Sequence, residues 1–132
     1  MNLLLDTHVL IWAIMDTSKL SPTARFHLVE SENKVYVSAV SLWEIAIKHA
    51  LGKLDLKGVA PADLVTYATD EVGFNLLDLN SRLAAEYGHV PALHPDPFDR
   101  MLIHQAVSGG FYLVSADRKF KEYKSYGLKL VW

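Results

Sequence analysis

Cysteine is absent from the sequence, so the chain can form neither a disulfide framework nor a thiolate metal site. An excess of basic residues is missing as well: 13 Lys and Arg residues stand against 15 Asp and Glu residues, which gives a formal net charge of −2. Proteins that hold nucleic acid through their overall charge are usually clearly basic. If this chain binds a nucleic acid, local basic residues and bound cations must supply the attraction.

Long apolar stretches are also missing. No segment has the ~18 consecutive apolar residues that a membrane-spanning helix needs. The first residues contain no basic region, and Asp6 interrupts their apolar run, so they lack the pattern of a secretory signal peptide. We expect a soluble, cytoplasmic protein that does not associate with membranes.

The residues that are present predict one folded domain. The chain has 132 residues, of which 51% are hydrophobic and 21% are charged, and this balance favours a packed core. The length is typical of a single domain, and no repeat, low-complexity tract or linker divides residues 1–132.

Short apolar segments alternate with longer segments of helical pattern. We expect strands at residues 2–5, 35–37, 74–77, 111–114 and 129–131. We expect helices at residues 7–15, 22–30, 41–51, 61–71, 81–87, 97–108 and 120–123. This alternation predicts an α/β sandwich with a mainly parallel sheet.

Four acidic residues lie close to the ends of these elements. Asp6 directly follows the first strand, and Asp117 comes shortly after the fourth. Because ligands of open parallel sheets bind beyond the carboxyl ends of the strands, both acids should lie at the reactive edge. Glu44 and Asp99 fall in the first turns of two expected helices. The pattern does not decide whether Asp99 lies at this edge or at the opposite one.

Each acid also has a plain structural interpretation. Ser41 and Glu44 have the spacing of a capping box, in which the two side chains accept from each other's backbone N–H groups. Asp96 and Pro97 have the pattern of a helix start, where the helix dipole would favour Asp99. The other two acids could cap the helices that follow them.

A convergence of all four acids would instead indicate a metal site. Two carboxylates held ~5 Å apart repel by about 3 kcal/mol at an effective dielectric constant near 20. A cluster of four therefore needs cations, and hard oxygen ligands select Mg²⁺ or Mn²⁺. Such an ion can polarise a phosphate, lower the pKa of a bound water and stabilise a leaving oxygen, which are the requirements of phosphodiester hydrolysis.

Several segments, in order and at characteristic spacing, carry a family resemblance. They are Leu4-Leu5-Asp6-Thr7-His8 with Trp12 close behind, residues 37–48 (VSAVSLWEIAIK), Gly52-Lys53-Leu54, residues 94–106 (HPDPFDRMLIHQA) and Val114-Ser115-Ala116-Asp117. Together they resemble the PIN-domain ribonucleases, and in particular the VapC-type toxins of type II toxin–antitoxin systems.

The resemblance implies a PIN-like three-layer sandwich, with a twisted sheet of about five strands and helices on both faces. It implies that four acids surround one pocket as catalytic residues and ligands of Mg²⁺ or Mn²⁺. It further implies cleavage of tRNA, rRNA or mRNA by a homodimer that a cognate antitoxin silences. The four acids are Asp6, Glu44, Asp99 and Asp117, and the supporting residues are Thr7, Ser115, Asp96 and Arg100.

The remaining candidates have weaker patterns. For Arg100 we expect an ion pair with Asp96 rather than a phosphate contact. For His94 and His104 we expect structural or surface roles, while His8 should lie near the pocket. Four lysines could attract RNA. Two tryptophans have the helical spacing of core residues, but an exposed part of them could also contribute to a dimer or antitoxin groove. These six residues are Lys48, Lys53, Lys119, Lys121, Trp12 and Trp43.

Three alternatives stay open at this stage. A structure-specific DNA nuclease of the related flap class would need further helical segments that 132 residues do not accommodate. A phosphoacceptor receiver domain needs an acidic pair after its first strand, whereas Asp6 is followed by Thr7 and His8. A non-catalytic RNA-binding PIN-like module is disfavoured because all four acids are present.

Overall fold

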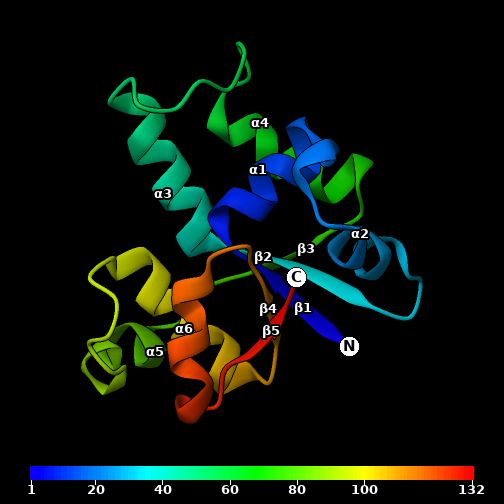
Figure 1. Cartoon of the computed structure of the whole chain (residues 1–132). Coiled ribbons are helices and arrows are strands. Elements are labelled where there is room, and N and C mark those ends of the chain that lie inside the picture. Colours follow the sequence, from blue (N-terminus) through cyan, green and yellow to red (C-terminus); the bar gives the residue numbers. More distant parts are fainter.

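The centre of the fold is a five-stranded sheet in which all neighbouring strands run parallel, as seen in a computed structural model that describes residues 1–132. The strand order is β3-β2-β1-β4-β5 (Figure 1). The strands are β1 (Asn2–Leu5), β2 (Lys34–Ser38), β3 (Asn75–Leu77), β4 (Tyr112–Val114) and β5 (Lys129–Val131). The expected parallel α/β sheet is confirmed.

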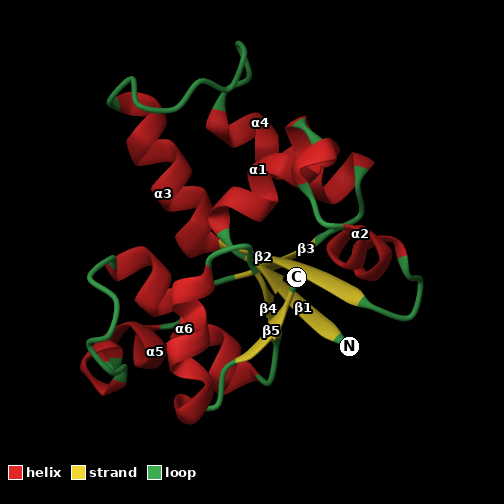
Figure 2. Ribbon diagram, viewed as in Figure 1, coloured by secondary structure: helices red, strands yellow, loops and turns green.

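Helices cover both faces of the sheet (Figure 2). The α-helices are α1 (Thr7–Met15), α2 (Pro22–Val29), α3 (Ala39–Ala50), α4 (Pro61–Thr66), α5 (Ser81–Ala85) and α6 (Pro97–Gly109). The 3₁₀ helices are η1 (Thr17–Lys19), η3 (Tyr87–His89) and η4 (Arg118–Tyr126), and η2 (Tyr67–Glu71) is a π-helical turn. None of the helices is both long and apolar enough to cross a membrane.

Strand β1 joins two separate hydrophobic cores because its side chains alternate between the faces of the sheet. Leu3 and Leu5 pack into the core formed with α1, α2 and α4. Leu4 points the other way, into the core formed with α6 and η4. A strand that is buried on both faces reads as a continuous apolar run, which explains why residues 3–5 are all leucine.

The order of the strands reverses next to β1. From β1 the chain adds β2 and β3 on one side, and later adds β4 and β5 on the other. The switch point therefore lies between β1 and β4. Asp6 directly follows β1 and Asp117 follows β4, so both residues flank this point at the carboxyl edge of the sheet.

The position of Asp99 is decided by the direction of α6. This helix ends at Gly109, Gly110 adopts a left-handed conformation (φ 71°), and β4 starts two residues later. A helix that leads directly into a parallel strand runs antiparallel to it, so its N-terminus lies at the carboxyl edge. Asp99, in the first turn of α6, therefore lies at the same edge as Asp6 and Asp117.

The capping box expected at residues 41–44 is wrong. Helix α3 begins at Ala39, immediately after β2, and its N-cap is Ser38, whose hydroxyl accepts from the Val40 amide at 3.0 Å. Ser41 and Glu44 consequently lie inside the helix, and both are buried. The side chain of Glu44 is thus free for contacts other than capping.

Candidate metal centre

Asp99 and Asp117 meet at the carboxyl edge of the sheet together with His94, which precedes α6. One ligand atom from each residue lies within 4.8 Å of the others. His94 Nε2 is 3.5 Å from Asp99 Oδ2 and 3.7 Å from Asp117 Oδ2. These separations are longer than ordinary hydrogen bonds. They are close to the roughly 3.0–3.5 Å between neighbouring ligands of one ion at bond lengths of about 2.1 Å.

His94 lies within the cluster, whereas the sequence analysis expected a structural or surface role for it. Its side chain is buried, and Nε2 has no hydrogen-bond partner, although it points at two carboxylates. Nδ1 accepts from the Asp96 backbone N–H at 3.3 Å, which orients the ring. A buried polar atom without a partner requires an explanation, and a cation or solvent molecule at the cluster provides one. The feature of the sequence that could have indicated this position is that His94 lies two residues before Asp96, the N-cap of α6.

Asp6 combines a structural contact with a position beside the cluster. Its Oδ1 accepts from the Val9 amide at 2.8 Å and so caps α1. Burial raises the pKa of Asp6, whereas hydrogen bonding from Ser115 and from the Val9 amide lowers it. Asp117 also contributes to the increase, which indicates that the two carboxylates act on each other.

Glu44 is buried, and both of its carboxylate oxygens have partners. Oε1 accepts from Thr7 Oγ1 at 2.6 Å, and Oε2 accepts from Lys48 Nζ at 2.5 Å. The hydrogen bond to Glu44 is the main cause that raises the pKa of Lys48. Lys48 lies one turn further along α3 and therefore neutralises a carboxylate that has only 3% of its side chain exposed.

Asp99 shows most clearly that the acids share one electrostatic environment. Burial and, after it, four neighbouring carboxylates together raise the pKa of Asp99 from 3.8 to about 7. In order of effect these carboxylates belong to Asp96, Glu44, Asp6 and Asp117. Glu44 and Asp6 thus lie outside the compact group of His94, Asp99 and Asp117, yet near enough to oppose the ionisation of Asp99.

Asp117 both caps η4 and takes part in the cluster. Its Oδ1 accepts from the Lys119 amide at 2.9 Å, while Oδ2 is the atom that faces His94. The carboxylate can do both because its two oxygens accept independently. The two interpretations that the sequence left open for this residue therefore do not exclude each other.

The supporting residues have varied contacts. Thr7 Oγ1 also lies 3.1 Å from Ser41 Oγ, which leaves it held between two buried groups of α3. Ser115 Oγ accepts from the Asp117 amide at 3.0 Å. Asp96 is the N-cap of α6, and its Oδ1 accepts from the amides of Phe98 and Asp99.

The ion pair expected between Arg100 and Asp96 is wrong. Arg100 donates to the Tyr87 hydroxyl at 2.9 Å and to the Val90 carbonyl at 2.8 Å, and its guanidinium carbon lies 4.4 Å from the centre of the Tyr87 ring. These contacts hold the segment around η3 against α6. Asp96 uses its carboxylate on backbone amides, so the two side chains serve different partners.

Two cavities adjoin the cluster and share Ala116 and Asp117. The smaller, of about 280 Å³, is also lined by Asp6, His8 and Trp12, so the expected position of His8 near the pocket is confirmed. The larger, of about 810 Å³, lies along η4 and β5. The carboxylates supply hard oxygen donors and His94 supplies a buried nitrogen without a partner, so these residues fit a divalent cation.

Comparisons with known proteins agree with this architecture. Ribonuclease VapC22 of Mycobacterium tuberculosis is 25% identical over 132 residues, which cover 99% of this chain and 98% of the relative. A chain in the crystal structure of VapBC2 from Rickettsia felis bound to a DNA fragment from their promoter has a TM-score of 0.71 and 18% identity, covering 98% of this chain and 97% of that one.

A chain in the crystal structure of DNA-bound VapBC from Salmonella typhimurium has a TM-score of 0.68 and 21% identity, covering 98% of this chain and 96% of that one. At these identities the structural likeness establishes the fold. The model of the PIN domain family matches residues 3–125, nearly the whole sequence. The chain therefore belongs to the PIN domain family.

Proposed function

We propose that the chain is a metal-dependent endoribonuclease and the toxin of a VapBC-type toxin–antitoxin pair. The main support is the convergence at one sheet edge of His94, Asp99 and Asp117, with Glu44 and Asp6 close enough to add to the rise that burial causes in the pKa of Asp99. The mycobacterial relative is a ribonuclease, and the similar solved structures are of VapBC, so both point to the same activity and pairing.

In this proposal Asp6, Glu44, Asp99 and Asp117 hold Mg²⁺ or Mn²⁺. When bound, the ion polarises the scissile phosphate and lowers the pKa of the attacking water. Asp99 releases its proton as the cation binds, because its pKa of about 7 keeps it partly protonated at neutral pH. Thr7 keeps Glu44 oriented, and the Ser115 hydroxyl fixes the backbone at Asp117.

Cleavage of RNA by variants of the acids tests the activity. We expect the purified chain to cut single-stranded RNA with Mg²⁺ or Mn²⁺ and to stop when EDTA is added. Asp99→Asn should lower the cleavage rate by about 100-fold or more, because the loss of one preorganised charge at a reaction centre has effects of this size. Asp63→Asn, an exposed acid on α4, is the matched control and should cleave like the wild type.

The same assay distinguishes the alternatives. Cutting of branched DNA but not of RNA would favour a structure-specific DNA nuclease. RNA binding without cleavage under any divalent cation would favour a non-catalytic module. Cleavage by Asp99→Asn at the wild-type rate would contradict the proposed role of the cluster.

We propose further that the chain acts in the cytoplasm as a homodimer that an antitoxin inhibits. Trp43 supports a protein interface, because 61% of this large apolar side chain is exposed and its ring lies 5.2 Å from that of Phe98, which joins it in one mainly apolar pocket. Expression of the chain alone should arrest growth. Co-expression with a small protein encoded next to it should restore growth, and light scattering should give twice the monomer mass.

A further inference from the structure

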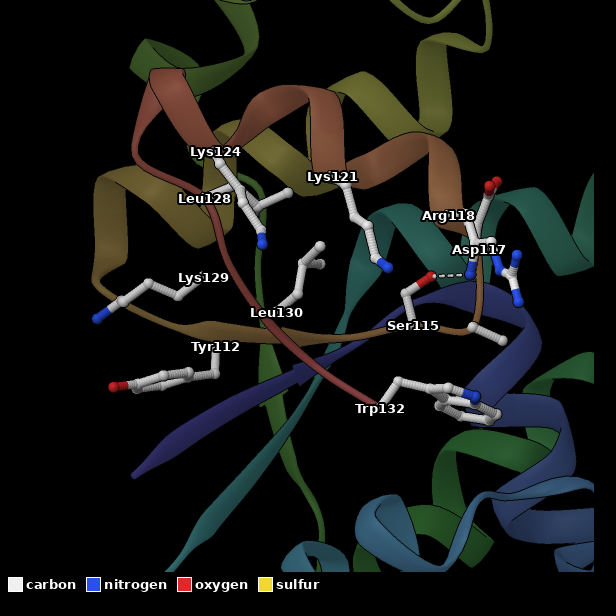
Figure 3. A pocket seen from close by; sticks show the side chains of 11 residues that line it. Tyr112, Ser115, Asp117, Arg118, Lys121, Lys124, Leu128, Lys129, Leu130 and Trp132 are labelled. Atoms are coloured by element: carbon white, nitrogen blue, oxygen red, sulfur yellow. Dashed lines mark hydrogen bonds between the residues drawn. The ribbon is translucent and has the colours of Figure 1, made fainter.

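Basic residues gather in the larger cavity beside Asp117, although the chain as a whole has a formal net charge of −2. Four of the 13 Lys and Arg residues line this cavity, and Asp117 is its one acidic lining residue. The four are Arg118, Lys121, Lys124 and Lys129 (Figure 3). The surface next to the carboxylates is therefore positive, while the rest of the chain is negative.

Three of these cations form a straight row because η4 is a 3₁₀ helix of nine residues. Arg118, Lys121 and Lys124 are spaced by three residues, and a 3₁₀ helix has three residues per turn, so the side chains eclipse one another. In an α-helix the same spacing would turn away by about 60° per step. With a rise of ~2.0 Å per residue, the row places a positive charge about every 6 Å.

A second row of η4, a third of a turn away, anchors the helix and leaves the cations free. Phe120 and Tyr123 are almost completely buried, and the Tyr123 hydroxyl donates to the Pro91 carbonyl at 2.8 Å. None of the three cations of the row is in a salt bridge. In Figure 3, Lys124 extends toward Leu130, Lys121 extends toward Ser115, and Asp117 lies at the end of the row near Arg118.

The end of the cavity near Asp117 is also aromatic. Trp132 lines the cavity, has 39% of its surface exposed, and its ring lies 6.0 Å from that of Trp12. Trp12 lines the smaller cavity with Asp6, and both cavities share Asp117. A cationic row, the carboxylate cluster and a pair of aromatic rings thus follow one another on a continuous surface.

We propose that this cavity binds the phosphate backbone of single-stranded RNA beside the cleaved bond. Arg118, Lys121 and Lys124 contact successive phosphates, and Trp132 offers a ring on which a base stacks. A narrow row of cations that ends at aromatic rings is the arrangement by which proteins hold single strands. This proposal rests on the proposed ribonuclease function, and it explains how a chain of negative net charge attracts RNA.

Binding of a fluorescent single-stranded RNA in EDTA tests the cavity without cleavage. For single strands, log K falls with log salt concentration with a slope of ~0.7 per phosphate contact. Lys121→Gln/Lys124→Gln should therefore reduce this slope by about 1.4 and weaken binding roughly tenfold at 0.1 M salt. Lys19→Gln/Lys34→Gln removes the same charge from exposed lysines outside the cavity, and it should keep the slope.

A charge-neutral exchange tests the row itself. Lys124→Gln/Ser125→Lys keeps the net charge and moves one cation by a third of a turn around η4. Ser125 and Lys124 are both exposed, so neither change affects the core. We expect binding as weak as that of Lys124→Gln alone. Recovery of the wild-type affinity would show that any nearby charge suffices, and it would contradict the proposed role of the aligned row.

The outcomes separate this proposal from the proposed function. If the wild type cleaves RNA and the double Lys→Gln variant binds and cleaves equally well, the cavity is not the RNA site and the nuclease stands. If the double variant shows the expected reduction in salt slope but the wild type never cleaves RNA, the assignment of the cavity is supported and the proposed nuclease activity is contradicted. Absence of RNA binding, or equal binding of polyglutamate, would overturn the assignment of the cavity to RNA.

Discussion

At the scale of single residues, Asp99 destabilises the folded chain at neutral pH, and the proposed cation would offset this effect. Its pKa of about 7 lies above the ordinary value of 3.8, because burial and neighbouring carboxylates oppose its ionisation. The folded state therefore binds the proton more tightly than the unfolded state. The resulting loss of stability is absent below about pH 4, grows as the pH rises toward 7, and is complete above 7.

Asp99→Asn should remove this penalty. The shift corresponds to at most about 4 kcal/mol, and because 20% of the side chain is exposed we expect about 1–2 kcal/mol after screening. In EDTA at pH 8 the variant should be more stable than the wild type by this amount, and the two should converge near pH 4. Urea unfolding between pH 4 and pH 8 measures the difference, and a difference that does not vary with pH would contradict an origin in the ionisation of Asp99.

A second prediction at this scale concerns His94. Its ring packs near Phe120, with 5.7 Å between the ring centres, so His94→Phe should preserve the fold. Removal of the nitrogen that faces Asp99 and Asp117 should weaken Mn²⁺ binding by about tenfold or more, as the loss of groups that support metal ligands does.

The matched control for His94→Phe is His104→Gln. His104 is also buried, but its ring contacts Glu86 and Tyr126 instead of the cluster. This variant should lose stability and keep its Mn²⁺ affinity, measured by electron paramagnetic resonance. Unchanged affinity in His94→Phe would show that the imidazole serves only packing.

At the scale of elements, the sequence predicts the strands and the site edge better than the helix starts. The apolar run of β1 and the acids after β1 and β4 are local patterns, so they were readable. The start of α3 was not, because Ser38 and Ser41 are both plausible caps and only the immediate turn from β2 into the helix selects Ser38. The sequence predicts only a structural or surface role for His94, because its place in the cluster depends on contacts between segments far apart in the chain.

Helix α3 also places a built-in counterion one turn after a buried acid. Lys48→Gln should leave Glu44 without its neutralising partner in metal-free buffer. Loss of a buried pair costs about 3–5 kcal/mol, but 41% of the Lys48 side chain is exposed, so about 1–2 kcal/mol is expected. A divalent cation should bind several-fold more tightly to this variant, because a competing positive charge has gone.

Isothermal titration with Mn²⁺ and thermal unfolding in EDTA measure both effects of Lys48→Gln. Lys53→Gln, an exposed lysine in the following loop, changes the net charge equally and should alter neither quantity. Weaker cation binding by Lys48→Gln would mean that the lysine orients Glu44 for the site rather than competing with the cation.

At the scale of the whole molecule, the fold concentrates charges of opposite sign on two adjoining surfaces. The reversal of strand order beside β1 brings acids from several elements to one edge, and the 3₁₀ form of η4 aligns cations next to it. Neither arrangement is visible in the net charge of −2. Burial and mutual repulsion oppose the ionisation of Asp99. If a cation binds there as proposed, folding stability should report on its binding.

Addition of Mg²⁺ or Mn²⁺ should therefore raise the melting temperature, and more at high pH than at low pH. A ligand present at 100 times its dissociation constant stabilises the folded state by about 2.7 kcal/mol. This corresponds to a rise in melting temperature of roughly 10 °C for a chain of this length.

The low-pH case differs because at pH 5.5 a proton occupies Asp99, whose pKa is about 7, and the cation must displace it. The apparent affinity then falls by about 30-fold, so the same concentration should raise the melting temperature by only about 3 °C. Asp99→Asn should lose most of the pH dependence, and an equal shift at pH 5.5 and pH 8 in the wild type would show that the cation binds away from this cluster.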